Sequence, residues 1–419
     1  MQEVASRRRL LALIAGSTAL SGCLDGEDQD DGNETDGGDG DNDSDDDEDG
    51  GDEEFTVGEP FEAAISISDE EWPLYSKDEA NTGYSDSTSL ETPLDVDWQT
   101  ELRLPVSRSV VVGGEAVFAV DGDDGDGTVY AVDAPSGDVL WNYEHDEEVR
   151  ASPAVSESTV YAVGRDDVLY AFDVSNGEER WNADVRGATR RSAPTLADDM
   201  VYVGSDEGLH AFGAYSGMER FATDSGAVET TPAVVDGVVY YGSDDGSLYA
   251  VDAESGEVEW EFETDGSVQS SPAVVDGSVY FGSNDRWFYC VDVDGEEVWS
   301  YEVGDRLETS PAVAGGSVYF GSAGGELYGL DAEDGEESWD EPVDAGNWVR
   351  DGVAVAGDHV LATRRGGVLL VVEAGSGSVV QEVDLDDLVE DVTVSSPGAP
   401  VPVGDHVFVG AGPDLVALR

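Results

Sequence analysis

YAVDAESGEVEW, residues Tyr249–Trp260, recurs with variations down most of the chain. Each copy combines a strand of alternating apolar residues, a tight turn on Ser-Gly, Asn-Gly or Asp-Gly, and a second strand. Glycine supplies the positive φ that such a short hairpin needs. The other copies are Tyr130–Trp141, Tyr170–Trp181, His210–Phe221, Tyr289–Trp299, Tyr328–Trp339 and the more divergent Leu370–Gln381. The sequence therefore predicts one hairpin that is used many times.

Two further strands precede each hairpin. In Ser271–Ser283 (SPAVVDGSVYFGS), SPAVV is the first strand, Asp276-Gly277 forms the turn and SVYFG is the second strand. The last strand of a unit ends in an aromatic residue at Trp98, Trp141, Trp181, Phe221, Trp260, Trp299 and Trp339, and Gln381 stands in the eighth such position. Four antiparallel strands at a period near 40 residues predict a β-propeller.

The two ends of the repeat region complement each other. The tail Val403–Arg419 supplies two strands of the repeat but lacks the outer strand. The missing strand is present at the front, in Asp95–Leu102 (DVDWQTEL). We therefore predict an all-β, eight-bladed propeller over residues 95–419, whose last blade is closed by the N-terminal strand around Trp98. Residues 55–94 are predicted to form a lead-in strap, because the aromatic residues of Trp72–Ser76 and Asn81–Ser85 need somewhere to pack.

The N-terminus has the features of an export signal over residues 1–22. Arg7-Arg8-Arg9 precedes the apolar segment Leu10–Leu20 and fits the twin-arginine pattern. The following Leu-Ser-Gly-Cys resembles a lipobox, which predicts a lipidated Cys23 and anchoring to the outer face of the cytoplasmic membrane. An ordinary cleaved signal with an incidental cysteine is the alternative. Residues 23–54 are predicted to be a disordered acidic tether, because Asp25–Glu54 contains 18 acidic residues and no Lys or Arg.

The formal net charge is −76, and Lys77 is the only lysine. Such a chain repels itself in dilute buffer and is screened in strong brine, so we hypothesise a salt-adapted prokaryotic host. The charge argues against binding to nucleic acid or to an anionic membrane surface, since phosphate binding needs clustered Lys and Arg. Contact with the membrane is therefore expected through the lipid anchor only. With two cysteines, no disulfide framework is expected.

The unit SPAVVDG-VYYGSDDGSLYAVDAESGEVEW resembles the PQQ-like (quinoprotein-type) propeller repeat. That family includes eight-bladed quinoprotein alcohol dehydrogenases and the non-catalytic lipoprotein BamB. The resemblance implies that the aromatic residues closing each unit, from Trp98 to Trp339, pack between neighbouring blades. It is specific for the fold and a poor guide to activity.

The resembling dehydrogenases hold their quinone with a vicinal disulfide, a Trp floor, a Ca²⁺ bound by Glu, Asn and Asp, and an Asp base. This chain has no adjacent cysteines, and its units lack long insertions. The motif Asp121–Gly127 (DGDDGDG) has no bidentate Glu at the offset that a calcium loop requires and is better explained as an acidic hairpin turn. We therefore predict no catalytic residue, no metal site and no cofactor. A PQQ-dependent dehydrogenase with Ca²⁺ is the alternative.

Arginines gather on one predicted face. Three positions before the Pro of each SPAV-type strand stand Arg150, Arg191, Glu229, Gln269 and Glu308, and Arg108, Arg190 and Arg350 lie close to equivalent positions. Arginine recognises carboxylate or phosphate through its planar fork, and Trp348 adds an aromatic anchor. Pairing of these arginines with neighbouring acids is an equally good explanation.

These features together predict a non-catalytic binding or scaffold protein, BamB-like by resemblance. It would present the arginine-bearing face to a protein partner or an anionic ligand at the cell envelope, as a monomer or within an envelope complex. Binding of a surface glycan through exposed aromatic residues, Trp287 and Trp348, is a weaker alternative.

Overall fold

The computed structural model describes residues 71–85, 90–106, 108–123, 125–149, 151–189, 191–389 and 393–419. All of the described residues belong to one compact unit, Thr56–Arg419. The predicted signal, the acidic tether and Cys23 lie outside the described residues.

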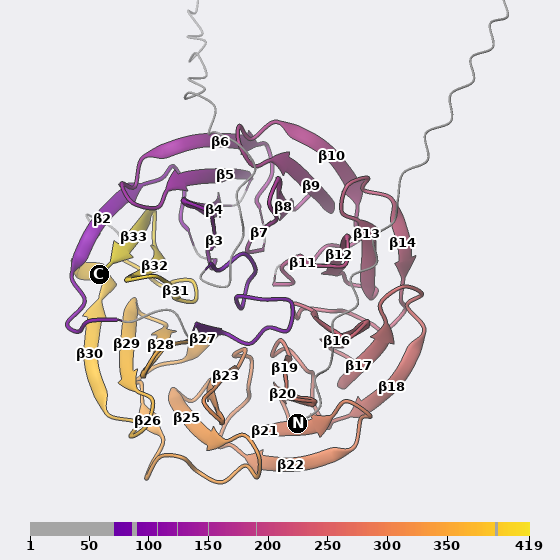
Figure 1. Ribbon diagram of the computed structural model, residues 1–419, viewed down its shortest axis with the longest axis vertical. Helices are drawn as coiled ribbons and strands as arrows, with labels where there is room; N and C mark the ends of the chain where they lie inside the picture. The colour runs from indigo at the N-terminus through magenta and orange to yellow at the C-terminus, as the bar shows by residue number, and fades with distance from the viewer. Residues whose placement is uncertain are drawn as a thin grey trace, which may run out of the picture. The chain divides into compact units, whose positions relative to one another are not determined.

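Eight sheets are arranged in a ring, with the shortest strand of most sheets at the centre (Figure 1). Blade 1 consists of β3 (Val111–Gly113), β4 (Ala116–Asp123), β5 (Asp126–Asp133) and β6 (Val139–His145), and blade 2 of β7 (Ala154–Val155), β8 (Thr159–Val163), β9 (Val168–Asp173) and β10 (Glu179–Asp184). Blade 3 consists of β11 (Thr195–Ala197), β12 (Met200–Gly204), β13 (Leu209–Gly213) and β14 (Glu219–Ala222), and blade 4 of β15 (Ala233–Val235), β16 (Val238–Gly242), β17 (Ser247–Asp252) and β18 (Val258–Glu263). All neighbouring strands within these blades are antiparallel.

Blades 5 to 8 continue the pattern. Blade 5 consists of β19 (Ala273–Val275), β20 (Ser278–Gly282), β21 (Trp287–Asp292) and β22 (Glu297–Glu302), and blade 6 of β23 (Ala312–Ala314), β24 (Ser317–Gly321), β25 (Glu326–Asp331) and β26 (Val343–Asp344). Blade 7 consists of β27 (Val349–Ala356), β28 (His359–Arg364), β29 (Val368–Glu373) and β30 (Val379–Asp384), and blade 8 of β31 (Val401–Val403), β32 (His406–Ala411) and β33 (Asp414–Leu418) with β2 (Val96–Glu101). The predicted eight-bladed, all-β propeller is confirmed, and the one described helix is the 3₁₀ turn η1 (Leu385–Asp387).

The ring closes through the N-terminal strand, as predicted. Strand β2 pairs antiparallel with β33, so that Trp98 lies opposite Ala417 and Gln99 opposite Val416. Blade 8 is therefore built from both ends of the propeller, which removes the free sheet edge that an open ring would expose.

Two blades depart from the expected pattern. In blade 6 the outer strand is only Val343–Asp344, and Trp339 lies before it, outside any regular strand. Pro342 follows Trp339 closely and has no backbone N–H to donate to a sheet ladder, which accounts for the late start of this strand. Blade 7 gains a fifth strand, because β1 (Tyr84–Ser85) pairs in parallel with β27.

Aromatic residues at the ends of the outer strands pack against the neighbouring blade. Trp141 donates its indole N–H to the carbonyl of Val174 in blade 2 at 2.9 Å, and its ring lies against Gly177 of the same turn. A Cβ added at Gly177 would lie 2.6 Å from Trp141 Cε3, so only glycine fits there. Equivalent indole hydrogen bonds, of 2.8–3.1 Å, join Trp98 to Ala134, Trp181 to Ala214, Trp260 to Val293, Trp299 to Ala332 and Trp339 to Ala374. Phe221 packs on Gly256 without such a bond, because it has no donor.

The segment 71–85 runs across the centre of the ring along the innermost strands (Figure 1). Its backbone carbonyls accept hydrogen bonds from one residue in each of six blades, namely Val112, Val155, Val234, Val274, Val313 and Val355, at 2.5–3.0 Å. The side chain of Asn81 is buried and donates to the carbonyls of Thr231 and Pro272 at 3.0 and 3.1 Å. This segment, called the strap below, ties six blades together from inside the ring.

Candidate functional site

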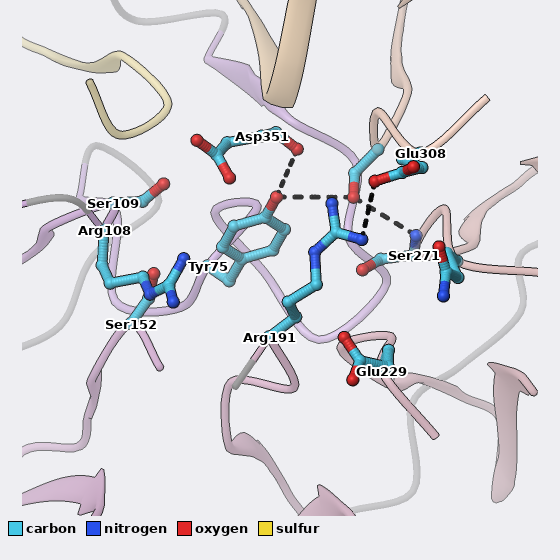
Figure 2. Close-up of a pocket in the computed structure, with 11 residues that line it drawn as sticks. Tyr75, Arg108, Ser109, Ser152, Arg191, Glu229, Ser271, Glu308 and Asp351 are labelled. Carbon is cyan, nitrogen blue, oxygen red and sulfur yellow. Dashed lines mark hydrogen bonds and ion pairs between the residues drawn. The ribbon is translucent and has the colours of Figure 1, made fainter. Parts of the chain in front are cut away.

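A small cavity lies at the centre of the propeller, where the loops that lead into the innermost strands converge (Figure 2). Its volume is about 30 Å³. Seven blades and the strap contribute to its lining, which consists of Tyr75, Arg108, Ser109, Ser152, Arg191, Glu229, Gln269, Ser271, Glu308, Ser310 and Asp351. Nearly all of these groups are polar, and the volume is on the scale of a water molecule rather than of an organic ligand.

Tyr75 extends from the strap into this cavity (Figure 2). Its hydroxyl donates to the carbonyl of Asp351 at 2.5 Å and lies 3.5 Å from Ser310 Oγ. Burial raises the pKa of Tyr75 to about 12, so the phenol is neutral at ordinary pH. The strap therefore places a neutral aromatic side chain in the space that an open channel would leave.

An ion pair crosses the cavity from blade 3 to blade 6 (Figure 2). The guanidinium of Arg191 lies 2.9 Å from a carboxylate oxygen of Glu308, and the two side chains are only 15% and 9% exposed. Arg306 binds the other oxygen of Glu308 at 3.2 Å. Since one carboxylate is shared by two guanidinium groups, Arg191 is held in place and is occupied by charge pairing.

Removal from water dominates the electrostatics of the remaining charged groups. Burial raises the pKa of Asp351 and of Glu229, and the guanidinium groups of Arg108 and Arg191 oppose both rises. Burial likewise lowers the pKa of Arg108, an effect that Asp351 opposes. The cavity is thus a compact, internally balanced network of acids and arginines.

A second arginine-rich feature lies at the junction of blades 6 and 7. The guanidinium carbons of Arg306, Arg350 and Arg365 lie 5.1, 5.5 and 5.2 Å from the centre of the Trp348 ring. Arg364 is next to this group, since it is in register with Val349, the residue after Trp348. We call Trp348, Arg306, Arg350, Arg364 and Arg365 the Trp348 cluster.

Most of the predicted binding residues come together. Arg108, Arg191, Glu229, Gln269 and Glu308 all line the central cavity, while Trp348 and Arg350 belong to the Trp348 cluster. Arg150 and Arg190 lie outside the described residues. The structure adds Tyr75 and Asp351, which no sequence pattern predicted. It also adds Arg306, whose only sequence signal is its place two positions before Glu308 in the same loop.

Gln269 is engaged within its own surroundings. Its side chain donates to Asp244 at 2.7 Å and accepts from Asn284 at 3.1 Å. Trp287, the other aromatic residue considered for glycan binding, is partly exposed at the start of β21. Within the DGDDGDG motif, Gly122 of β4 pairs with Gly127 of β5.

An eight-bladed ring of four-stranded blades, joined by indole-to-carbonyl bonds, defines the class of PQQ-like propellers. The family model described as "Outer membrane protein assembly factor BamB" matches residues 95–231, 205–347 and 285–419. These ranges together span the whole propeller, so the chain belongs to this family. A comparison with curated proteins found no match.

Solved structures with the same fold include a BamB protein, a designed protein and alcohol dehydrogenases. BamB from Moraxella catarrhalis is 17% identical with a TM-score of 0.64, covering 78% of this chain and 97% of that chain. The quinohemoprotein alcohol dehydrogenase from Comamonas testosteroni is 14% identical with a TM-score of 0.67, covering 83% and 80%. The computationally designed protein Ika8 is 16% identical with a TM-score of 0.65, covering 80% and 98%. At these identities the likeness establishes the fold and leaves the activity open.

The dehydrogenases in this fold class imply a quinone with Ca²⁺, and the residues at the centre of this propeller do not fit that pair. The cavity of about 30 Å³ is far smaller than the roughly 300 Å³ at which sites for organic ligands begin. Tyr75 and the Arg191–Glu308 pair occupy the space. Within the described residues, no group of three His, Cys, Asp or Glu side chains is placed to hold a metal ion. Across the same residues, no helix has the length and apolar composition needed to cross a bilayer.

Proposed function

We propose that the protein is a non-catalytic binding or scaffold protein, exported and lipid-anchored, that presents its arginine-bearing face to a protein partner or an anionic ligand. One observation carries the proposal. Arg350, Arg364 and Arg365 form no ion pair with any described carboxylate, although the chain carries 95 Asp and Glu residues. In so acidic a protein, unpaired arginines gathered at one place favour recognition over charge balance.

Arg191 pairs with Glu308, and Arg165 in the turn between β8 and β9 pairs with Glu148, which supports the charge-balancing explanation for these two arginines. The Trp348 cluster supports the recognition explanation. The binding face is therefore assigned to the junction of blades 6 and 7 rather than to the central cavity.

The alternatives are less well supported. A quinone-dependent dehydrogenase requires a central site of several hundred Å³, and the central cavity measures about 30 Å³. A glycan would stack on an open indole face, but three guanidinium groups already lie against Trp348. Family membership supports an envelope protein that assembles with others, since the family is described by an outer membrane assembly factor.

Export and anchoring rest on the N-terminal signals. The Arg7-Arg8-Arg9 cluster, the apolar segment and the Leu-Ser-Gly-Cys sequence at Cys23 support a folded protein that is exported and lipidated. Replacing Cys23 by Ser should release the full-length protein from membranes into the soluble fraction. Retention in the membrane fraction would contradict the anchor.

The test of the binding function is cross-linked capture from the membranes of the producing cell at native salt. The Arg350→Ala/Arg365→Ala variant should lose the captured partner. The control variant Arg186→Ala/Arg419→Ala, which removes the same charge from arginines paired with Glu219 and Asp405, should retain it. Equal capture by both folded variants would contradict the proposed face.

A further inference from the structure

The Trp348 cluster contains several hydrogen-bond donors that nothing in the protein satisfies. Trp348 Nε1, Arg350 Nε and Arg364 Nε are buried from solvent and have no acceptor in the described part of the chain. Buried N–H groups without an acceptor are costly and uncommon in folded proteins. Trp348 immediately precedes β27, Arg350 lies on β27 and Arg364 lies on β28. Three such donors at this junction indicate a site built for an acceptor that the described residues do not supply.

The charge of the cluster is also uncompensated. Its four arginines are offset at ion-pair distance by one described carboxylate, that of Glu308, which Arg191 shares. The nearby Asp351 carboxyl interacts with Arg350 and also with Arg108 and Arg191, and burial disfavours its charged form. The cluster therefore keeps an excess of positive charge in a chain whose net charge is −76.

Stacking on the indole does not account for this arrangement by itself. A single guanidinium over a Trp ring is a favourable pair. Here three guanidinium carbons lie within 5.5 Å of one ring centre, so three like charges lie within about 11 Å of each other and repel. An anion among them would turn this repulsion into attraction.

We infer that the Trp348 cluster is a binding site for a phosphoryl group, with Arg306, Arg350, Arg364 and Arg365 neutralising its charge and the free N–H groups donating to its oxygens. A phosphoryl group fits better than a carboxylate because it carries nearly two negative charges and three acceptor oxygens. The inference rests on the proposed function in that it assigns the anionic ligand of that function to one place. Two sources share this chemistry, free inorganic phosphate and the phosphomonoester headgroup of a larger molecule.

Calorimetric titration of the full-length protein tests the site, with inorganic phosphate, glycerol 3-phosphate and acetate compared at one pH and one high KCl concentration. Phosphate should bind once per chain and at least about tenfold more tightly than acetate. Arg350→Ala/Arg365→Ala should weaken phosphate binding by about tenfold for each arginine removed, while Arg186→Ala/Arg419→Ala should bind as the wild type does. Trp348→Phe should remove any change in tryptophan fluorescence that accompanies binding.

The two phosphate sources give different results. Binding of inorganic phosphate alone identifies the free anion, whereas equal or tighter binding of glycerol 3-phosphate identifies a headgroup. Absence of binding by both probes overturns the inference, as does binding that acetate matches or that the cluster variant retains. If neither phosphate probe binds, yet the cluster variant still loses its captured partner, this inference fails while the proposed function stands. If phosphate binds at the cluster but capture of the partner does not depend on these arginines, this inference stands and the proposed function fails.

Discussion

Gln381 of blade 7 and Leu94, two residues before β2, are joined by a double hydrogen bond. The Gln381 side-chain oxygen accepts from the Leu94 amide at 2.6 Å, and its amide nitrogen donates to the Leu94 carbonyl at 2.9 Å. Gln381 stands where seven other blades carry an aromatic residue. Since Leu94 leads into the strand that closes the ring, this side chain holds the joint at which the two ends of the propeller meet.

The Gln381→Ala variant should therefore lose about 1–3 kcal/mol of stability, because two backbone groups of Leu94 lose their partner. Urea unfolding at fixed high KCl measures the difference. Gln99→Ala is the matched control, since Gln99 lies exposed on β2 itself, and it should change stability by less than about 0.5 kcal/mol. Equal effects of the two substitutions would show that the joint does not depend on Gln381.

The joint between blades 3 and 4 lacks one hydrogen bond that its neighbour has. The Ala214 carbonyl accepts from both Tyr161 and Trp181, each at 3.0 Å, whereas the Ala253 carbonyl accepts from Tyr202 alone at 2.9 Å. Phe221→Trp should supply the missing donor and stabilise the fold by about 0.5–1.5 kcal/mol. A Phe221→Trp variant no more stable than the wild type would contradict the role assigned to the indole N–H.

The reciprocal change, Trp181→Phe, removes a donor from an existing joint. The Trp181 ring would still pack on Gly217, but the Ala214 carbonyl would keep only the Tyr161 hydroxyl. We expect a loss of about 0.5–1.5 kcal/mol, measured in the same unfolding experiment. Phe221→Trp should therefore raise the free energy of unfolding, and Trp181→Phe should lower it.

Asp351 should make stability depend on pH. Below the ordinary aspartate pKa of about 3.9, the carboxyl is protonated in both folded and unfolded protein and carries no cost. As the pH rises through its raised folded pKa, the folded protein must ionise a carboxyl removed from water, and stability falls. Asp351→Asn should therefore gain stability relative to the wild type as the pH rises above about 4. Paired urea titrations measure this difference, and a difference that stays constant or shrinks with pH would contradict the account.

The acidic composition predicts a strong dependence on salt. Self-repulsion of a chain with net charge −76 is screened when the Debye length falls to about 3 Å at 1 M salt. The melting temperature should therefore rise with KCl concentration and fall on dialysis into dilute buffer. Unchanged melting on dialysis to low salt would remove the argument for a salt-adapted host.

The repeat made the fold predictable from the sequence. Glycine turns and closing aromatics at a regular spacing fixed the blades, and the lone outer strand around Trp98 fixed how the ring closes. The same alignment placed Arg191, Glu229 and Glu308 at equivalent loop positions, and equivalent positions of a ring face its centre.

Features outside the repeat could not be predicted in the same way. The strap has no periodicity, so nothing in the sequence indicated that Tyr75 enters the central cavity. Arg306 stands two positions before Glu308, the aligned position, and its contacts with Glu308 and Trp348 depend on the path of one loop. Irregular segments take their conformation from tertiary packing, which spacing alone does not encode.

A non-catalytic propeller that binds its partner at the Trp348 cluster would carry no quinone at its centre. The most direct measurement is titration of the full-length protein with PQQ and Ca²⁺ at native salt, followed by a dye-reduction assay with primary alcohols. We expect no saturable binding of the quinone and no alcohol-dependent reduction, because Tyr75 and the Arg191–Glu308 pair fill the central cavity. One-to-one binding of the quinone with alcohol-dependent dye reduction would contradict this expectation.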